Sequence, residues 1–184
     1  MAFIQVIEHE HSSGELRGIY DHLVATRGKL ADVHKIQGLN PPTVLSHMNL
    51  YKDIMFGQSP LKRYQREMIG VVVSSVNQCE YCVKHHYEAL NHYWKDDIRM
   101  ASLLQQKYNQ LTETDRVLCE FALEITRNPE LSTQQRIDNL RGCGLDDRAI
   151  LDATLVASYF NFVNRIVLTL GLEINHSEIS GYNY

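Results

Sequence analysis

The sequence contains no block of lysine and arginine residues, no long apolar run and no extended alternation of polar and apolar residues. A surface that binds nucleic acid or an anionic membrane requires a basic stripe, which the formal net charge of -4 also disfavours. The longest apolar runs, such as residues 71–73, fall far short of the ~20 residues that span a bilayer. We therefore expect a protein that contacts neither nucleic acid nor membrane.

Features of secretion are also missing. Residues 1–9 lack the basic start and the sustained apolar stretch of a signal peptide, so we expect a cytoplasmic protein. Its four cysteines are then not a framework of structural disulfides, because the cytosol is reducing. No linker or low-complexity segment divides the 184 residues, a length that fits the roughly 100–200 residues of one domain. We expect a single domain spanning residues 1–184.

Helical periodicity dominates the sequence, and capping residues, Pro and Gly mark where helices begin and end. The predicted helices cover residues 43–56, 61–76, 80–93 and 97–104, a segment from the cap Thr112 to 126, a short one opened by a capping box of Ser132 and Gln135, and the longest from the cap Asp146 to 170. In helix 61–76 the apolar side chains recur on one face, which we expect to point inward. Four glycines punctuate the first forty residues and leave the helices there undefined. The sequence predicts an all-α fold of seven or eight helices.

One pair of cysteines is spaced for chemistry. His86 follows Cys82 by four positions and Cys82 follows Cys79 by three, so on a continuous helix the three side chains share one stripe. Two thiols so placed can close a disulfide, and the imidazole can take the thiol proton or pair with the thiolate. The neighbouring His85 points about a quarter turn away, so periodicity selects His86.

Glu67 is a fourth candidate, twelve residues before Cys79 on the preceding helix. Its apolar neighbours indicate that this helix is mostly buried, and a buried carboxylate needs a partner. The alternative is that Glu67 is exposed and pairs on the helix surface with Arg63 and Arg66. The pattern alone leaves both interpretations open.

A Cys-x-x-Cys pair in an intracellular chain has three interpretations. Redox chemistry is the first. A zinc site built from Cys79, Cys82, His86 and Glu67 is the second, although structural zinc sites usually recruit a second, distant ligand pair, and the sequence contains none. The third is that both cysteines are small core residues, which is how we interpret Cys119 in its apolar stretch. We favour redox chemistry.

The set Glu67, Cys79-Glu80-Tyr81-Cys82 and His86 resembles the core motif of the alkylhydroperoxidase D (AhpD) proteins, within the carboxymuconolactone decarboxylase superfamily. That motif is Glu, eleven residues, Cys-x-x-Cys, three residues, His, and the spacing here fits at every position. Segments 111–129 and 158–165 resemble the group called peroxidase-related enzymes, so the resemblance covers nearly the whole chain, with a redox core at about residues 61–93.

The resemblance implies an AhpD-like helical bundle that assembles into homo-oligomers (dimers, trimers or hexamers) and reduces peroxides without a cofactor. Carried over by position, Cys82 is the peroxidatic cysteine, Cys79 the resolving one, and Glu67 and His86 the proton relay. The sequence departs from AhpD at Tyr81, where AhpD has a further His. The relay therefore lacks one titratable member.

We expect a thiol-dependent peroxidase for hydrogen peroxide or organic hydroperoxides, in which an external dithiol, lipoyl-type or thioredoxin-like, restores the cysteine pair. The analogy with thioredoxin would instead make Cys79 the nucleophile, because it lies at the helix start. Three alternatives remain: a general thiol–disulfide oxidoreductase, a zinc-binding module and a non-catalytic helical assembly protein.

The last predicted helix carries a polar patch inside an apolar sequence. Asn161, Asn164 and Arg165 lie three and four positions apart and share a face. They either make helix–helix hydrogen bonds or a subunit contact, or bring Arg165 or an Asn close to the cysteines. We did not include them among the catalytic residues.

Overall fold

The computed structural model describes residues 2–131 and 133–174. Within these residues it contains nine α-helices, two short 3-10 helices (His9–His11 and Pro129–Leu131) and no strand. The all-α prediction is confirmed, but the structure has more helices than the seven or eight that were expected. The difference lies in the first forty residues, which form α1 (Gly14–Arg27) and the short α2 (Asp32–Lys35).

The helices that build the centre follow the predicted boundaries closely. Pro residues in its first turn start α3 (Pro41–Phe56), and Gly57 ends it. Next come α4 (Arg63–Val76), α5 (Glu80–Trp94) and α6 (Asp97–Leu104), of which α6 is capped by the Asp96 side chain. α4 begins two residues later than expected.

The C-terminal half contains α7 (Glu113–Arg127), α8 (Gln134–Gly142) and the long α9 (Asp147–Leu170). Thr112 and Asp146 cap α7 and α9 with their side chains, as predicted, and Gly171 ends α9 in a left-handed conformation. Ser132, the predicted cap of the short helix, lies outside the described residues.

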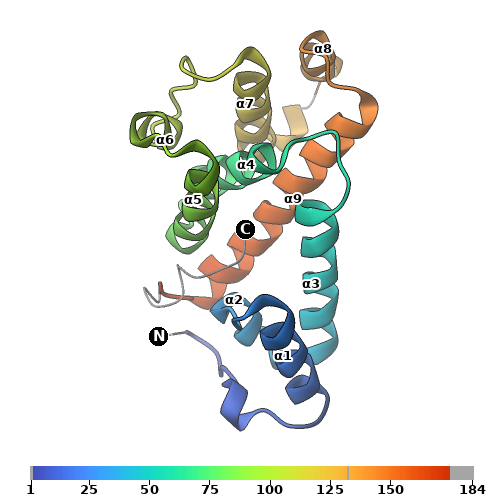
Figure 1. Ribbon diagram of the computed structural model, residues 1–184, viewed down its shortest axis with the longest axis vertical. Coiled ribbons are helices and arrows are strands. Elements are labelled where there is room, and N and C mark those ends of the chain that lie inside the picture. Colours follow the sequence, from blue (N-terminus) through green and yellow to red (C-terminus); the bar gives the residue numbers. More distant parts are fainter. Residues whose placement is uncertain (1, 132, 175–184) are drawn as a thin grey trace.

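The centre of the molecule is α4. It packs against α3, α5, α6, α7 and α9, and Figure 1 shows it crossed by the long diagonal of α9. Every residue from 65 to 74 is therefore buried. The prediction of one inward face was wrong, because neighbouring helices cover α4 on all sides.

The first three helices form a smaller unit at one end of the molecule (Figure 1). α1 and α3 pack together through a separate apolar cluster of Ile19, Leu23, Val44 and Met48. α3 also contacts α4 and α9, so this unit is joined to the central helices along one side.

α9 is long and apolar enough to cross a membrane by length and composition alone, with a window of mean hydropathy 1.3. Much of that window, 44%, is buried inside the fold. Its polar Asn164 is fully buried and hydrogen-bonded to Ser74 of α4. We therefore interpret α9 as the core helix of the fold.

Close approach of α4 and α9 depends on Gly70. A Cβ atom at this position would lie 2.6 Å from two ring atoms of Phe160. The Phe160 ring in turn stands edge-on to His86, with ring centroids 4.4 Å apart. Gly70 thus sets the position of an aromatic ring that supports a candidate site residue.

We expect Gly70→Ala to destabilise the protein by about 1–3 kcal/mol, because the Phe160 ring must move within a packed core. Chemical denaturation would measure the loss. Gly18→Ala is the matched control: it lies in α1 with no atom near the added Cβ, and we expect it to stabilise by about 0.5–1 kcal/mol. Equal stability of the two variants would contradict this account of the α4–α9 contact.

Candidate active site

The two cysteines lie at the tight connection between α4 and α5. Gln78 adopts a left-handed conformation (φ 58°), and Cys79 is the N-cap residue of α5. Cys82 lies in the first turn of the same helix. Both thiols are therefore at a helix N-terminus, as predicted, where the helix dipole favours a negative charge. Both side chains are buried, and both cysteines are free thiols.

Three asparagines fix this connection to α9. The Asn77 amide donates to the side-chain oxygens of Asn161 and Asn164, each at 3.0 Å. The Asn164 amide donates to Ser74 Oγ at 3.1 Å and also hydrogen-bonds to both Cys79 and Cys82. One buried side chain, that of Asn164, thus holds the Asn77 side chain before the thiols and both thiols themselves.

Glu67 is buried in the middle of α4, with 1% of its surface exposed. One carboxylate oxygen lies 2.6 Å from His86 Nδ1, and the other lies 2.6 Å from Arg63 one turn earlier on α4. The interpretation of Glu67 as an exposed residue was wrong. Its pairing with Arg63 occurs, but beneath α5 rather than on the surface.

The ion pairs decide the charge of Glu67. Burial by itself would raise the pKa of this carboxyl, but His86 and Arg63 outweigh burial and hold the pKa below its ordinary value of 4.5. Glu67 therefore carries a negative charge at neutral pH. That charge orients the His86 ring through Nδ1 and leaves its other nitrogen for a different partner.

The two thiols differ in acidity. The hydrogen bond from Cys82 lowers the pKa of Cys79 against the effect of burial, and Asn164 lowers it further. The pKa of Cys82 is raised well above its ordinary value by the same interaction with Cys79 and by burial. In the resting pair the charge therefore belongs first to Cys79, and Cys82 needs a base to become a thiolate.

Cys82 opens into a cleft between the N-terminal unit and the central helices. The empty volume of the cleft is about 700 Å³, counting its open mouth. Aromatic rings form much of its wall, and Cys79 is not among its lining residues. The titratable and aromatic side chains that line it are Arg27, His34, Tyr51, Phe56, Arg63, Glu67, Tyr81, Cys82, His85, His86, Tyr159 and Phe160.

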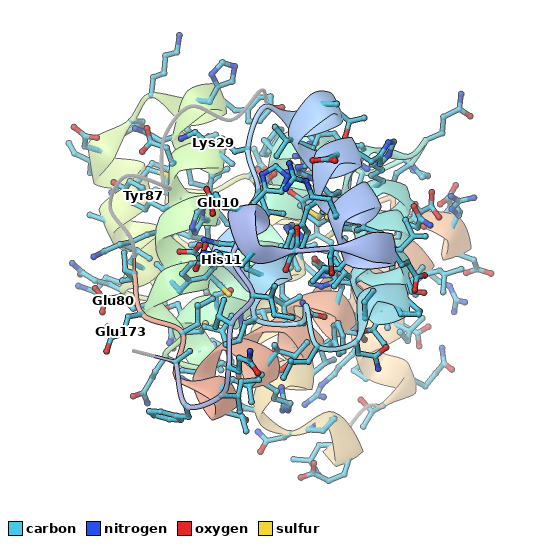
Figure 2. The ribbon with its side chains drawn as sticks, turned by 90° about the horizontal axis from the view of Figure 1, so that it is seen from below. Glu10, His11, Lys29, Glu80, Tyr87 and Glu173 are labelled. Atoms are coloured by element: carbon cyan, nitrogen blue, oxygen red, sulfur yellow. The ribbon has the colours of Figure 1, made fainter. Side chains whose placement is uncertain are left out.

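Figure 2 shows the molecule from below, with Glu10 and His11 of the N-terminal segment across the front. Glu80 and Tyr87 of α5 lie on the side opposite α1. The two residues after Glu80, Tyr81 and Cys82, line the cleft instead. α5 thus directs Glu80 and Tyr87 outward and the Cys82 thiol toward the cleft.

Tyr81, in the position where AhpD has a His, is part of the cleft wall. Its hydroxyl accepts a hydrogen bond from the Val33 amide at 3.3 Å, and its ring packs on His85 with centroids 4.5 Å apart. Burial lowers the pKa of His85 to about 4, so this ring is neutral. His85 therefore shares the cleft with His86, which spacing alone did not indicate.

The structure brings together Cys79, Cys82, His86 and Glu67, which the sequence singled out. Within the described part of the chain, however, no three Cys, His, Asp or Glu side chains are arranged to hold a metal ion. His86 uses Nδ1 for Glu67, so the four predicted zinc ligands do not converge on one point.

Both alternatives that the sequence left open for the polar patch on α9 occur, whereas other residues of the cleft were missed. Of the polar patch on α9, Asn164 reaches the cysteines, whereas Arg165 is exposed and bonds back to Asn161. His34 and Tyr159 also line the cleft. The spacing of Asn164 gave a signal for a shared face with Asn161, but nothing in the sequence placed that face against α5.

Comparisons with known proteins agree with this fold. Residues 42–107, which span α3 to the end of α6, match the model of the carboxymuconolactone decarboxylase family. No curated protein matches the sequence. A solved structure of a peroxidase-related protein from Silicibacter sp. TM1040 is 27% identical, with a TM-score of 0.81, over 96% of this chain and 91% of that one.

Two further solved structures share the fold. An AhpD-core, peroxidase-related protein from Ralstonia eutropha JMP134 is 22% identical, with a TM-score of 0.85, over 97% of this chain and 94% of that one. The debrominase Bmp8, in complex with 2,3,4-tribromopyrrole, is 15% identical, with a TM-score of 0.79, over 97% of this chain and 96% of that one.

The fold and the buried dithiol define an AhpD-like helical protein. Residues 42–107 match the carboxymuconolactone decarboxylase family, and the whole chain has the fold of AhpD-like, peroxidase-related proteins. Proteins of this fold include an enzyme, the debrominase Bmp8.

The Glu67 ion pairs predict an acid-sensitive fold. Because the folded pKa of Glu67 lies below its unfolded value, the unfolded chain binds more protons, and stability falls as pH drops below 4.5. We expect Glu67→Gln to lose about 3–5 kcal/mol at neutral pH, since Arg63 stays buried without its partner, and to flatten the acid slope. Urea denaturation at several pH values would measure both effects.

Glu120→Gln, which removes a surface carboxylate paired with Arg116, is the matched control and should keep the wild-type acid slope. A Glu67→Gln variant with the full wild-type slope would contradict the stabilising role of the cluster.

Proposed function

We propose that this protein is a thiol-dependent peroxidase that reduces hydroperoxides through a Cys79–Cys82 dithiol/disulfide cycle. The observation that carries the proposal is the placement of the thiols. Cys82 opens into a cleft shared with the Glu67–His86 pair, while Cys79 lies behind it, out of the cleft and in hydrogen-bond contact with Cys82. One thiol can meet a substrate and the other can trap the product.

The first step requires the Cys82 thiolate. His86 lies one turn beyond Cys82 on α5 and in the same cleft, and Glu67 holds its ring. We assign this pair as the base, directly or through a water. The thiolate attacks the terminal oxygen of the hydroperoxide, the S–O bond forms as the O–O bond breaks, and the products are a Cys82 sulfenic acid and an alcohol or water.

Cys79 completes the reaction. Its sulfur attacks the Cys82 sulfenic acid, forming the disulfide and releasing water. The lowered pKa of Cys79 suits this step, because it raises the share of the resolving group that is thiolate. An external dithiol then reduces the disulfide by exchange, and we expect a lipoyl-type or thioredoxin-like donor in a reducing cytoplasm.

Two properties bear on which cysteine attacks the peroxide and which one resolves the sulfenic acid. Acidity favours Cys79 as the thiolate, whereas access favours Cys82, since a substrate in the cleft meets Cys82 and not Cys79. We give priority to access because a thiolate must touch the peroxide to react. The base at His86 compensates for the raised pKa of Cys82.

A second candidate is reductive dehalogenation of a small aromatic ring. The observation in its favour is the ring of aromatic side chains around Cys82, from Tyr51, Tyr81, Tyr159 and Phe160. The debrominase Bmp8 shares this fold. The balanced reaction would convert an aryl bromide and two thiols to the arene, bromide, a proton and the Cys79–Cys82 disulfide.

The central test is trapping of the sulfenic acid. After one equivalent of cumene hydroperoxide, we expect Cys79→Ser to accumulate a dimedone adduct on Cys82, detected by peptide mass spectrometry, because its resolver is gone. Cys82→Ser should consume peroxide at least about 100-fold more slowly than wild type, since the remaining thiol faces no cleft. Cys119→Ser, a buried cysteine outside the site, is the control and should behave as wild type.

A dimedone adduct on Cys79 in Cys82→Ser would reverse the assignment. If wild type reacts with small disulfides but with no hydroperoxide, it is a general thiol–disulfide oxidoreductase. Release of bromide from 2,3,4-tribromopyrrole without peroxide turnover would favour the second candidate.

We also propose that the protein works as a homo-oligomer of two, three or six copies. Along α9, Leu151, Leu155, Phe162 and Leu168 are each at least 41% exposed, which leaves an apolar strip on the surface of one copy. Sedimentation velocity should give a mass that is a multiple of 21.2 kDa, lowered by Phe162→Glu. A single 21.2 kDa species at micromolar concentration would contradict the proposal.

A further inference from the structure

A chain of hydrogen-bonded polar groups runs from α2 through α3 to Tyr159 at the cleft. It starts at the backbone oxygen of Val33, which lies 2.6 Å from Gln37 Nε2. Only the NH₂ end of an amide can donate to a carbonyl oxygen, so this contact fixes which way the Gln37 side chain is turned. The same nitrogen has a second hydrogen to donate.

That second hydrogen sets the tautomer of His47. Gln37 Nε2 lies 2.8 Å from His47 Nδ1, whereas Gln37 Oε1 lies 3.3 Å from it, so Nδ1 accepts from the amide. Burial lowers the pKa of His47 to about 4, so the ring is neutral and carries one hydrogen. With Nδ1 as the acceptor, that hydrogen is on Nε2.

The tautomer in turn directs the Tyr159 hydroxyl. His47 Nε2 lies 2.7 Å from Tyr159 Oη and donates to it. The oxygen accepts this bond, and its own hydrogen is left to donate elsewhere. Tyr159 of α9 lines the cleft into which Cys82 opens, beside Tyr51 of α3. Burial raises the pKa of Tyr159 well above its ordinary value, so the proton is present at neutral pH.

We propose that Tyr159 is the acid that protonates the leaving oxygen of an organic hydroperoxide at Cys82, with His47 and Gln37 as positioning residues. The inference rests on the proposed peroxidase function. It assigns to Tyr159 the half of the proton transfer that the Glu67–His86 pair does not perform. One side of the cleft takes the thiol proton and the other gives a proton to the product.

The step balances as follows. The Cys82 sulfur supplies two electrons to the terminal oxygen, the O–O bond breaks, and the leaving alkoxide takes the Tyr159 proton to become an alcohol. An alkoxide is a stronger base than an alcohol or a thiolate, so it takes a proton from the nearest available donor. His47 Nε2–H stabilises the phenolate, and the proton removed from Cys82 restores the phenol through solvent in the cleft.

Two aromatic peroxides with different leaving groups test the inference. Cumene hydroperoxide releases an alkoxide, which needs a proton, whereas peroxybenzoic acid releases benzoate, which does not. In single-turnover rapid-quench experiments, we expect Tyr159→Phe to slow Cys82 oxidation by cumene hydroperoxide about 100-fold, and oxidation by peroxybenzoic acid by no more than about threefold. A purely structural role would slow both reactions equally.

Two further variants complete the experiment. Gln37→Glu replaces the donor to His47 Nδ1 with an acceptor, so the hydrogen of His47 moves to Nδ1. His47 Nε2 then becomes an acceptor, and the Tyr159 hydroxyl donates its hydrogen to Nε2. We expect the same selective loss with cumene hydroperoxide, although the Tyr159 hydroxyl is still present. Tyr20→Phe is the control, because its buried hydroxyl bonds to Ile7 and Lys35 backbone oxygens away from the cleft, and both rates should be unchanged.

Equal slowing with both peroxides, or no slowing with either, in Tyr159→Phe would overturn the role of Tyr159. A wild-type protein that is oxidised by neither peroxide would instead overturn the proposed function, and this inference with it. The wild-type and variant arms therefore separate the two failures.

Discussion

The charge of Glu67 constrains the rest of the structure. A carboxylate at the centre of a helix that is covered on all sides is costly unless its neighbours compensate it. Arg63 does so from the same helix, and His86 from α5. The requirement that His86 reach Glu67 sets the rotation of α5 against α4, and that rotation places Cys82 in the cleft and Cys79 behind it.

The same arrangement gives the two thiols different properties. Cys79 is fixed by the Asn77–Asn164 contacts at the helix start and is the more acidic thiol, whereas Cys82 lines the cleft and is hard to ionise. A dithiol needs this asymmetry if one sulfur is to meet a peroxide and the other to resolve the product. The base beside Cys82 and the donor beside Cys79 are supplied by different helices, α5 and α9.

The cleft combines the proposed base and the proposed proton donor in one space. Glu67, His86 and Tyr159 line it, and His47 lies behind Tyr159, hydrogen-bonded to its hydroxyl. Tyr81 stands where the AhpD motif has a His and ties α5 to α2 through the Val33 amide. Proton donation is thereby left to a residue on α9, far from the motif in sequence. Aromatic walls also favour an organic substrate over a small polar one.

Much of the local structure was predictable from the sequence. Caps at Thr112 and Asp146, stops at Gly57 and Gly171, and the spacing of Cys79, Cys82 and His86 depend on neighbours within one or two turns, so local patterns determine them. The all-α class follows from the same periodicity. Helix α1 escaped prediction because its glycines weaken the local signal, although tertiary packing against α3 stabilises it.

The sequence by itself therefore determined most of the helices and the spacing of Glu67, Cys79, Cys82 and His86. Only the tertiary structure decided that Glu67 is buried, that Asn164 reaches the thiols, and that Tyr159, with His47 behind it, lines the same cleft as Cys82. The physical reason is that burial and hydrogen bonding of these side chains depend on helices 19 to 112 residues away in the chain, whose packing no local pattern specifies.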